Sequence, residues 1–184
     1  MPQPRRTHSP DAHTALLIVD MISEFTFPGG EALVGPAVRA AKHIAELKRR
    51  AHRRRTPIIY VNDTAGEWES DQRDFVRRCA QQGARGRKIV ELIAPTETDY
   101  FIFKLRHSGF FHTPLNSLLS KLRVQRLLLT GISAHQCVMF TAIDAHMRGY
   151  ELRVPRNGVA SPTPGQTRRA LTLLAEALDA DILD

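Results

Sequence analysis

Short apolar runs that alternate with helical segments constrain the fold of this chain more than any other feature. Runs typical of buried strands occupy residues 15–20, 58–63, 100–104, 126–131 and 150–154. Segments with helical spacing or helix-capping residues lie between these runs and after the last one. Because such an alternation forms parallel sheets with helices on both faces, we predict an α/β fold. The expected architecture is a three-layer α/β/α sandwich with a mainly parallel, Rossmann-like central sheet.

Several helix boundaries follow from residues that start or stop helices. Pro36 suits a first helical turn, so we expect the first helix to begin there. Gly149 suits the position after a helix that begins at Cys137. A helix over residues 71–82 is followed by a turn that contains glycine and arginine, and a final amphipathic helix is predicted over residues 166–178.

Length and composition indicate one globular domain over residues 1–184, with residues 1–13 as a flexible tail. A chain of 184 residues can bury a sufficient core without disulfides or metals. Hydrophobic residues make up 42% and charged residues 24%, which excludes disordered and fibrous classes.

The net charge of +7 raises the alternative of nucleic-acid binding. However, the densest basic run, residues 47–55, lies at the end of a predicted helix, where cations complement the helix dipole and face solvent. We therefore expect no nucleic-acid partner.

The N-terminal residues lack the apolar region of a secretory signal, and no run is long enough to span a membrane. The two cysteines, Cys79 and Cys137, suit a reducing compartment. We expect a cytoplasmic protein without a membrane partner.

Candidate catalytic residues follow the predicted strands. Asp20, Asp63, Lys104 and the loop before Cys137 all lie at carboxyl ends of strands, where ligands bind in open α/β sheets. The N-terminus of a helix favours a thiolate and lowers a cysteine pKa, so Cys137 is a candidate nucleophile. A small side chain packed under a loop is the alternative. A carboxylate could accept the thiol proton, and an ammonium could hold both anions in place.

Three segments together resemble the isochorismatase-like cysteine hydrolases, which include nicotinamidases, carbamoylsarcosine amidohydrolases and isochorismatases. These segments read LLIVDM, KLRHSGFFHTPL and TGISAHQCVMFTAIDAHMRGYEL, and the resemblance extends from about residue 15 to the final helix. It implies a catalytic triad with Cys137 as nucleophile, Asp20 as general base and Lys104 as its electrostatic partner. It also implies a cis peptide between Ile132 and Ser133, with the amides of Ser133 and Cys137 as oxyanion hole.

The same resemblance bears on metals. Nicotinamidases of this family hold a metal ion through an Asp-x-His arrangement and further histidines after the second strand. Here the segment VNDTAGEWESD contains Asp63 but no histidine, so we predict no metal. We expect no cofactor either, because no GxGxxG fingerprint or phosphate-binding loop occurs.

Four residues are candidates for substrate contact. Phe25, Trp68 and Phe110 follow the first, second and third strands, where aromatic walls often line small-ligand pockets, although packing within the loops is the alternative. His135 stands beside the nucleophile and is a candidate for specificity.

Isochorismatases of the resembled family split a vinyl ether without a cysteine nucleophile. The presence of Cys137 therefore favours, by resemblance, hydrolysis of a C–N bond in a small amide or carbamoyl substrate through a thioester. Two alternatives stay open. One is isochorismatase-like vinyl ether hydrolysis with Asp20 as acid catalyst, and the other is a non-catalytic basic binding protein. The resemblance also implies a homodimer or homotetramer.

Overall fold

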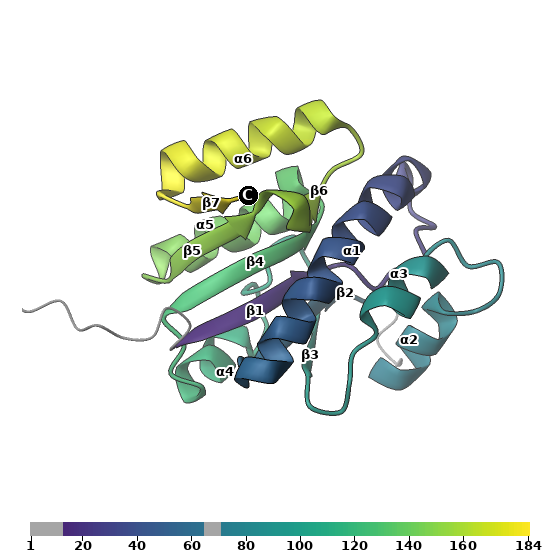
Figure 1. Cartoon of the computed structure of the whole chain (residues 1–184), viewed down its shortest axis with the longest axis horizontal. Coiled ribbons are helices and arrows are strands. Elements are labelled where there is room, and N and C mark those ends of the chain that lie inside the picture. The colour runs from purple at the N-terminus through teal and green to yellow at the C-terminus, as the bar shows by residue number, and fades with distance from the viewer. Residues whose placement is uncertain (1–12, 65–70) are drawn as a thin grey trace, which may run out of the picture.

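The computed structural model describes residues 13–64 and 71–184, and within them seven strands form one sheet. The strand order is β3-β2-β1-β4-β5-β7, with β6 paired to β4, and every pairing is parallel (Figure 1). The strands are β1 (Thr14–Val19), β2 (Ile58–Asp63), β3 (Tyr100–Lys104), β4 (Arg126–Ile132), β5 (Glu151–Pro155), β6 (Val159–Ala160) and β7 (Asp181–Leu183).

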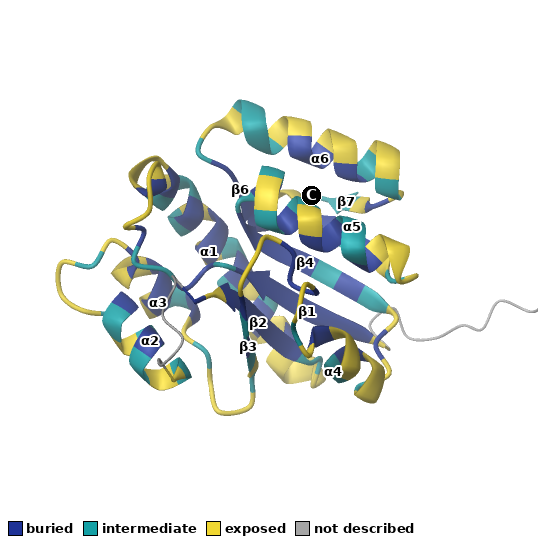
Figure 2. Ribbon diagram, turned by 180° about the vertical axis from the view of Figure 1, so that it is seen from behind, coloured by how far each residue is buried: buried dark blue, intermediate teal, exposed yellow. Residues whose placement is uncertain are grey.

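Helices cover both faces of this sheet, which confirms the predicted α/β/α sandwich (Figures 1 and 2). One face packs against α1 (Gly30–Arg54), α2 (Gln72–Cys79) and α3 (Arg87–Ile93). The other packs against α4 (Leu115–Lys121), α5 (Met139–Met147) and α6 (Pro164–Leu178). Strand β1 is buried along its whole length because its side chains alternate between the two hydrophobic cores. None of the helices in the described ranges is both long and apolar enough to cross a bilayer.

The first helix begins six residues before the proline that was expected to start it. Helix α1 runs from Gly30, and Pro36 lies inside it. The early turns are held by burial: Gly30 packs so closely that a Cβ there would lie 2.6 Å from the Phe25 carbonyl oxygen, and Leu33 is 2% exposed. Because proline lacks an N–H, the helix gives up one backbone hydrogen bond near its start, where the disruption is smallest.

Helix α3 was predicted as part of a turn. Its buried residues Ile89, Val90 and Ile93 recur at helical spacing and face the core beside α1. Gly83 and Gly86 precede it, and because glycines are typical of turns, this helix of only seven residues was not predicted. A 3₁₀ turn, Arg156–Gly158, joins β5 to the short strand β6. Neither β6 nor β7 was predicted.

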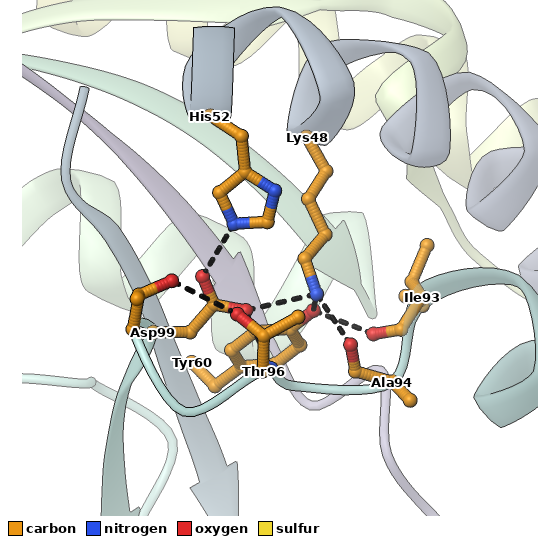
Figure 3. A network of polar contacts seen from close by, with 8 residues as sticks. Lys48, His52, Tyr60, Ile93, Ala94, Thr96 and Asp99 are labelled. Atoms are coloured by element: carbon orange, nitrogen blue, oxygen red, sulfur yellow. Dashed lines mark hydrogen bonds and ion pairs between the residues drawn. The ribbon is translucent and has the colours of Figure 1, made fainter. Parts of the chain in front are cut away.

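A buried polar cluster joins the end of α1 to β2 and to the segment between α3 and β3 (Figure 3). The Lys48 ammonium lies 2.9 Å from Asp99 Oδ2, donates to the Tyr60 hydroxyl at 2.9 Å and donates to the Ala94 carbonyl oxygen. The Tyr60 hydroxyl donates to the Ile93 carbonyl oxygen at 2.5 Å, and His52 Nε2 lies 2.9 Å from Asp99 Oδ1. Every charged atom in this cluster has a partner, which is the condition under which buried charges are tolerated.

Candidate active site

Parallel pairing places the ends of four strands at one edge of the sheet. Val19 at the end of β1 is in register with Val61 of β2 and with Gly131 of β4, and Asp63 is in register with Lys104 of β3. Residues that follow these strands therefore meet, as the topology predicts. The candidate site forms where they converge.

Gly131 is what allows β4 to approach β1 so closely at this edge. Its φ is +122°, and a Cβ there would lie 2.1 Å from the Val19 carbonyl oxygen. A side chain at this position would displace the backbone of β1 just before Asp20.

Asp20 sits directly after β1 with a φ of +52°, a left-handed conformation that aspartate tolerates better than most residues. Its Oδ1 accepts a hydrogen bond of 2.7 Å from the Asp63 amide, and its Oδ2 lies 2.9 Å from Lys104 Nζ. The side chain is 14% exposed. These contacts fix the carboxylate at the edge of the sheet.

Lys104 ends β3, and its side chain is fully buried. Its ammonium contacts Asp20, lies 3.7 Å from Asp63 Oδ2 and donates to Cys137 Sγ at 3.7 Å. Burial lowers the pKa of this amine, but the Asp20 carboxylate and the Cys137 sulfur outweigh burial, so the pKa is raised. Lys104 is thus a permanent cation between two groups of the candidate triad.

Cys137 lies in a π-helical turn, Ala134–Val138, and α5 begins only at Met139. The prediction that Cys137 is the first residue of a helix is wrong, because Cys137 is the fourth residue of this turn. The Ser133 carbonyl oxygen accepts from the Val138 amide at 3.2 Å, five residues on, which widens the turn that carries the thiol. The peptide bond between Ile132 and Ser133 is cis.

The pKa of the thiol moves opposite to the sequence argument, which expected a helix N-terminus to lower it. Burial, together with the nearby Asp20 carboxylate, raises the pKa of Cys137 to about 12, although Lys104 acts in the other direction. Burial also raises the pKa of the Asp20 carboxyl above its ordinary value, against the effect of Lys104. The thiol is therefore neutral at pH 7, and the Asp20 carboxyl group beside it is the candidate acceptor of its proton.

A cavity of about 530 Å³, called here the main cavity, opens onto Asp20 and Cys137. This volume is within the range of small-molecule sites, roughly 300–1,000 Å³. Ser133, predicted to supply an oxyanion-hole amide, also lines it. Its apolar walls come from Ile22, Phe27, Leu33, Phe75 and Ile132.

Two aromatic residues predicted to line the pocket lie elsewhere. Phe25 is fully buried in the core under α1, and its neighbour Phe27 lines the cavity instead. Phe110 is 5% exposed and packs in the opposite core, with Tyr150 at 5.9 Å between ring centroids and the Arg148 guanidinium 4.9 Å from its ring. For both residues the alternative of loop packing is what the structure shows. Trp68 lies outside the described residues.

His135 also faces away from the main cavity. Its Nδ1 lies 2.8 Å from the Ser161 hydroxyl oxygen, and the ring borders a second cavity between α5 and α6. Burial and the nearby Arg169 lower its pKa. The next residue, Gln136, lines the main cavity, so the side chain beside the nucleophile that can meet a substrate is Gln136.

Sequence reasoning missed Glu24, Phe27 and Phe75, which all line the main cavity. Phe75 lies in a helix that was predicted, but its side chain was not assigned to the site. Its spacing of four residues from Cys79 indicates that both side chains lie on the buried face of that helix. Cys79 itself is buried in α2.

The described residues do not fit a metal of the kind held by nicotinamidases. Among residues 13–64 and 71–184 no group of three or more His, Cys, Asp and Glu side chains is placed to hold an ion. Asp63, the remaining candidate ligand, lies 3.7 Å from the Lys104 ammonium, whose charge disfavours a cation there.

The family model for the isochorismatase domain matches residues 14–183. The chain belongs to the isochorismatase family of hydrolases. It is 40% identical over 171 residues to an uncharacterized isochorismatase family protein, YaaI, of Bacillus subtilis, and the match covers 93% of each chain.

Two solved structures of this family show how widely the fold is shared. The nicotinamidase SaPncA from Staphylococcus aureus is 28% identical, with a TM-score of 0.73 over 94% of this chain and 98% of that one. The N-carbamoylsarcosine amidase from Thermoplasma acidophilum is 27% identical, with a TM-score of 0.64 over 92% of this chain and 95% of that one. Both proteins are named for reactions on C–N bonds.

Proposed function

We propose that this isochorismatase-family hydrolase cleaves a C–N bond in a small amide or carbamoyl compound through a thioester on Cys137. The observation that carries the proposal is the contact between Asp20, Lys104 and Cys137 at the wall of a cavity large enough for such a substrate. Two similar proteins that are named as amide hydrolases support the same bond type.

The first half of the reaction uses all three residues. As the Cys137 sulfur bonds to the substrate carbonyl carbon, the thiol proton moves to the Asp20 carboxylate. The carbonyl oxygen becomes an oxyanion, for which the amides of Ser133 and Cys137 are the proposed donors. The C–N bond then breaks, the leaving nitrogen takes the proton from Asp20, and ammonia or an amine departs.

The second half regenerates the enzyme. A water molecule gives a proton to the Asp20 carboxylate and attacks the thioester carbonyl. The C–S bond breaks, the carboxylic or carbamic acid leaves, and the sulfur recovers its proton from Asp20. Lys104 stays charged throughout and holds the carboxylate and the sulfur in place.

Release of ammonia from a panel of primary amides and ureido compounds tests this proposal. We expect at least one compound to be turned over by the wild-type protein and none by Cys137→Ala. Cys79→Ala is the matched control, because Cys79 is buried in α2 and is not among the residues that line the main cavity. Ammonia release that survives in Cys137→Ala would exclude the thioester mechanism.

A further inference from the structure

The main cavity is acidic although the chain as a whole is basic. Three carboxylates line it, those of Asp20, Glu24 and Asp63, while the net charge of the chain is +7. Within the described part of the chain, no lysine or arginine is among the lining residues, and His107 is the one lining side chain that can become a cation. A bound molecule therefore meets mostly negative charge.

The cation beneath the cavity is already engaged. Lys104 is fully buried, and its ammonium contacts Asp20, Asp63 and the Cys137 sulfur. One positive charge faces two carboxylates, so it cannot also neutralise Glu24. Among the described lining residues a substrate carboxylate would find no comparable partner, and the desolvation of an unpaired charge disfavours binding.

Arg85 lies near the same loop but is directed elsewhere. Its Nη1 donates to the Phe25 carbonyl oxygen at 3.0 Å, and its Nη2 lies 3.7 Å from Glu31 Oε2. It is not among the residues that line the main cavity. These contacts hold the loop after β1, which carries Glu24.

Glu24, on the loop after β1, lines the same cavity as Cys137. Burial raises the pKa of the Cys79 thiol in α2 to about 12, and the nearby Glu24 carboxylate adds to the rise. Helix α2 belongs to the layer opposite α5, the helix that follows Cys137. The apolar wall of the cavity includes Phe27 and Phe75, which suit a flat ring or a short chain.

We propose that the site takes small amides whose far end carries a positive charge, that it rejects amides with a carboxylate there, and that Glu24 makes this choice. The inference rests on the proposed function, since it assigns a substrate class to the same cavity. It separates this protein from enzymes that act on ureido or carbamoyl acids, whose substrates carry a carboxylate.

Three amides of one shape test the inference: para-(aminomethyl)benzamide, para-methylbenzamide and para-carbamoylbenzoate. Their far ends are cationic, neutral and anionic, while the scissile amide is the same. We expect kcat/KM to fall in that order. The ratio between the cationic and the anionic compound is the quantity of interest, because a general loss of activity cancels in it.

Glu24→Gln removes one charge without changing the size of the side chain. If the charged group of the substrate lies several Å from the Glu24 carboxylate, we expect Glu24→Gln to lower the ratio of kcat/KM for the cationic compound to that for the anionic compound about tenfold, even at the dielectric constant of water. Glu24→Lys should invert the ratio. Glu176→Gln is the matched control, because Glu176 is exposed on α6, outside the cavity lining, and the ratio and the activity should stay unchanged.

Binding of the same compounds to Cys137→Ala, measured by calorimetry, separates this inference from the proposed function. Tighter binding of the cationic amide without turnover by the wild-type protein would retain the charge selection and count against the cysteine mechanism. The inference would be overturned if para-carbamoylbenzoate bound as tightly as the cationic amide or more tightly. It would also be overturned if Glu24→Gln left the cation-to-anion ratio unchanged, or if none of the three compounds bound.

Discussion

Asp20 acts on Cys137 in two opposite ways, and the two can be separated by mutation. It is the proposed acceptor of the thiol proton, yet its charge is one cause of the raised thiol pKa. Asp20→Asn should therefore reduce kcat by about 10²–10⁴-fold, the usual contribution of a general base. The same change should lower the pKa of Cys137, since Lys104 then acts on the sulfur without an opposing carboxylate.

Alkylation by iodoacetamide at pH 7, with peptide mapping to separate Cys137 from Cys79, measures this second effect. We expect slow modification of Cys137 in the wild-type protein and faster modification in Asp20→Asn, although activity falls. Slower modification in the variant would show that Asp20 does not raise the thiol pKa.

The pH dependence of kcat/KM should report the Asp20 carboxyl. This group must be ionised to accept the proton, and burial raises its pKa above the ordinary value of about 3.9. Activity should therefore fall with decreasing pH at a higher pH than an exposed aspartate would give. Lys104→Met should move this acid limb further upward, because Lys104 lowers the pKa of Asp20. An acid limb at or below pH 3.9 would contradict the assignment of Asp20 as base.

The sequence identified the residues of the candidate triad but not those of the cavity wall. Strand ends are fixed by the sheet, so Asp20 and Lys104 could be placed from the pattern alone. The direction of a loop side chain depends on local dihedrals that the pattern does not show. Phe25 has a φ of +55° and enters the core, whereas Phe27, two residues later, reaches the cavity.

At the level of elements, the close approach of β4 to β1 sets the geometry of the site. Gly131→Ala should destabilise the fold severely, because its Cβ would overlap the Val19 backbone and its φ is +122°. Gly149→Ala is the matched control: its φ is +81°, nothing lies within 4 Å of the added Cβ, and only the left-handed strain of about 1–2 kcal/mol remains. Urea denaturation of both variants measures the difference. Equal losses would show that β1 and β4 can move apart without penalty.

Element boundaries were predictable where burial on both faces left an unbroken apolar run. The five predicted strands all appear in the described structure, with shifts of a residue at their ends. Helix α1 and the turn at Cys137 were predicted less well. Tertiary packing of Gly30 and Leu33 overrode the proline signal, and a π-helical turn leaves no recognisable mark in a sequence.

For the whole molecule, the cluster around Lys48 connects three elements on the α1 face of the sheet (Figure 3). Asp99→Asn should destabilise the protein by about 3–5 kcal/mol, because it leaves the Lys48 ammonium buried without its carboxylate. The midpoint of urea denaturation at pH 7 measures this loss.

Glu91→Gln provides the comparison on the surface. Glu91 pairs with Arg87 and Lys88 in exposed positions, where ion pairs contribute little, so no measurable change is expected. Equal midpoints for the two variants would show that the buried cluster adds no more stability than a surface pair.

The most direct test of the account is the mass of the protein during turnover of an amide that it hydrolyses. Acid quenching within the first turnovers, followed by intact-mass measurement and peptide mapping, should show an acyl group on Cys137 that disappears when the substrate is exhausted. Cys137→Ala should show no adduct and no ammonia release. Turnover without an acyl group on Cys137, or ammonia release by Cys137→Ala, would contradict the thioester mechanism.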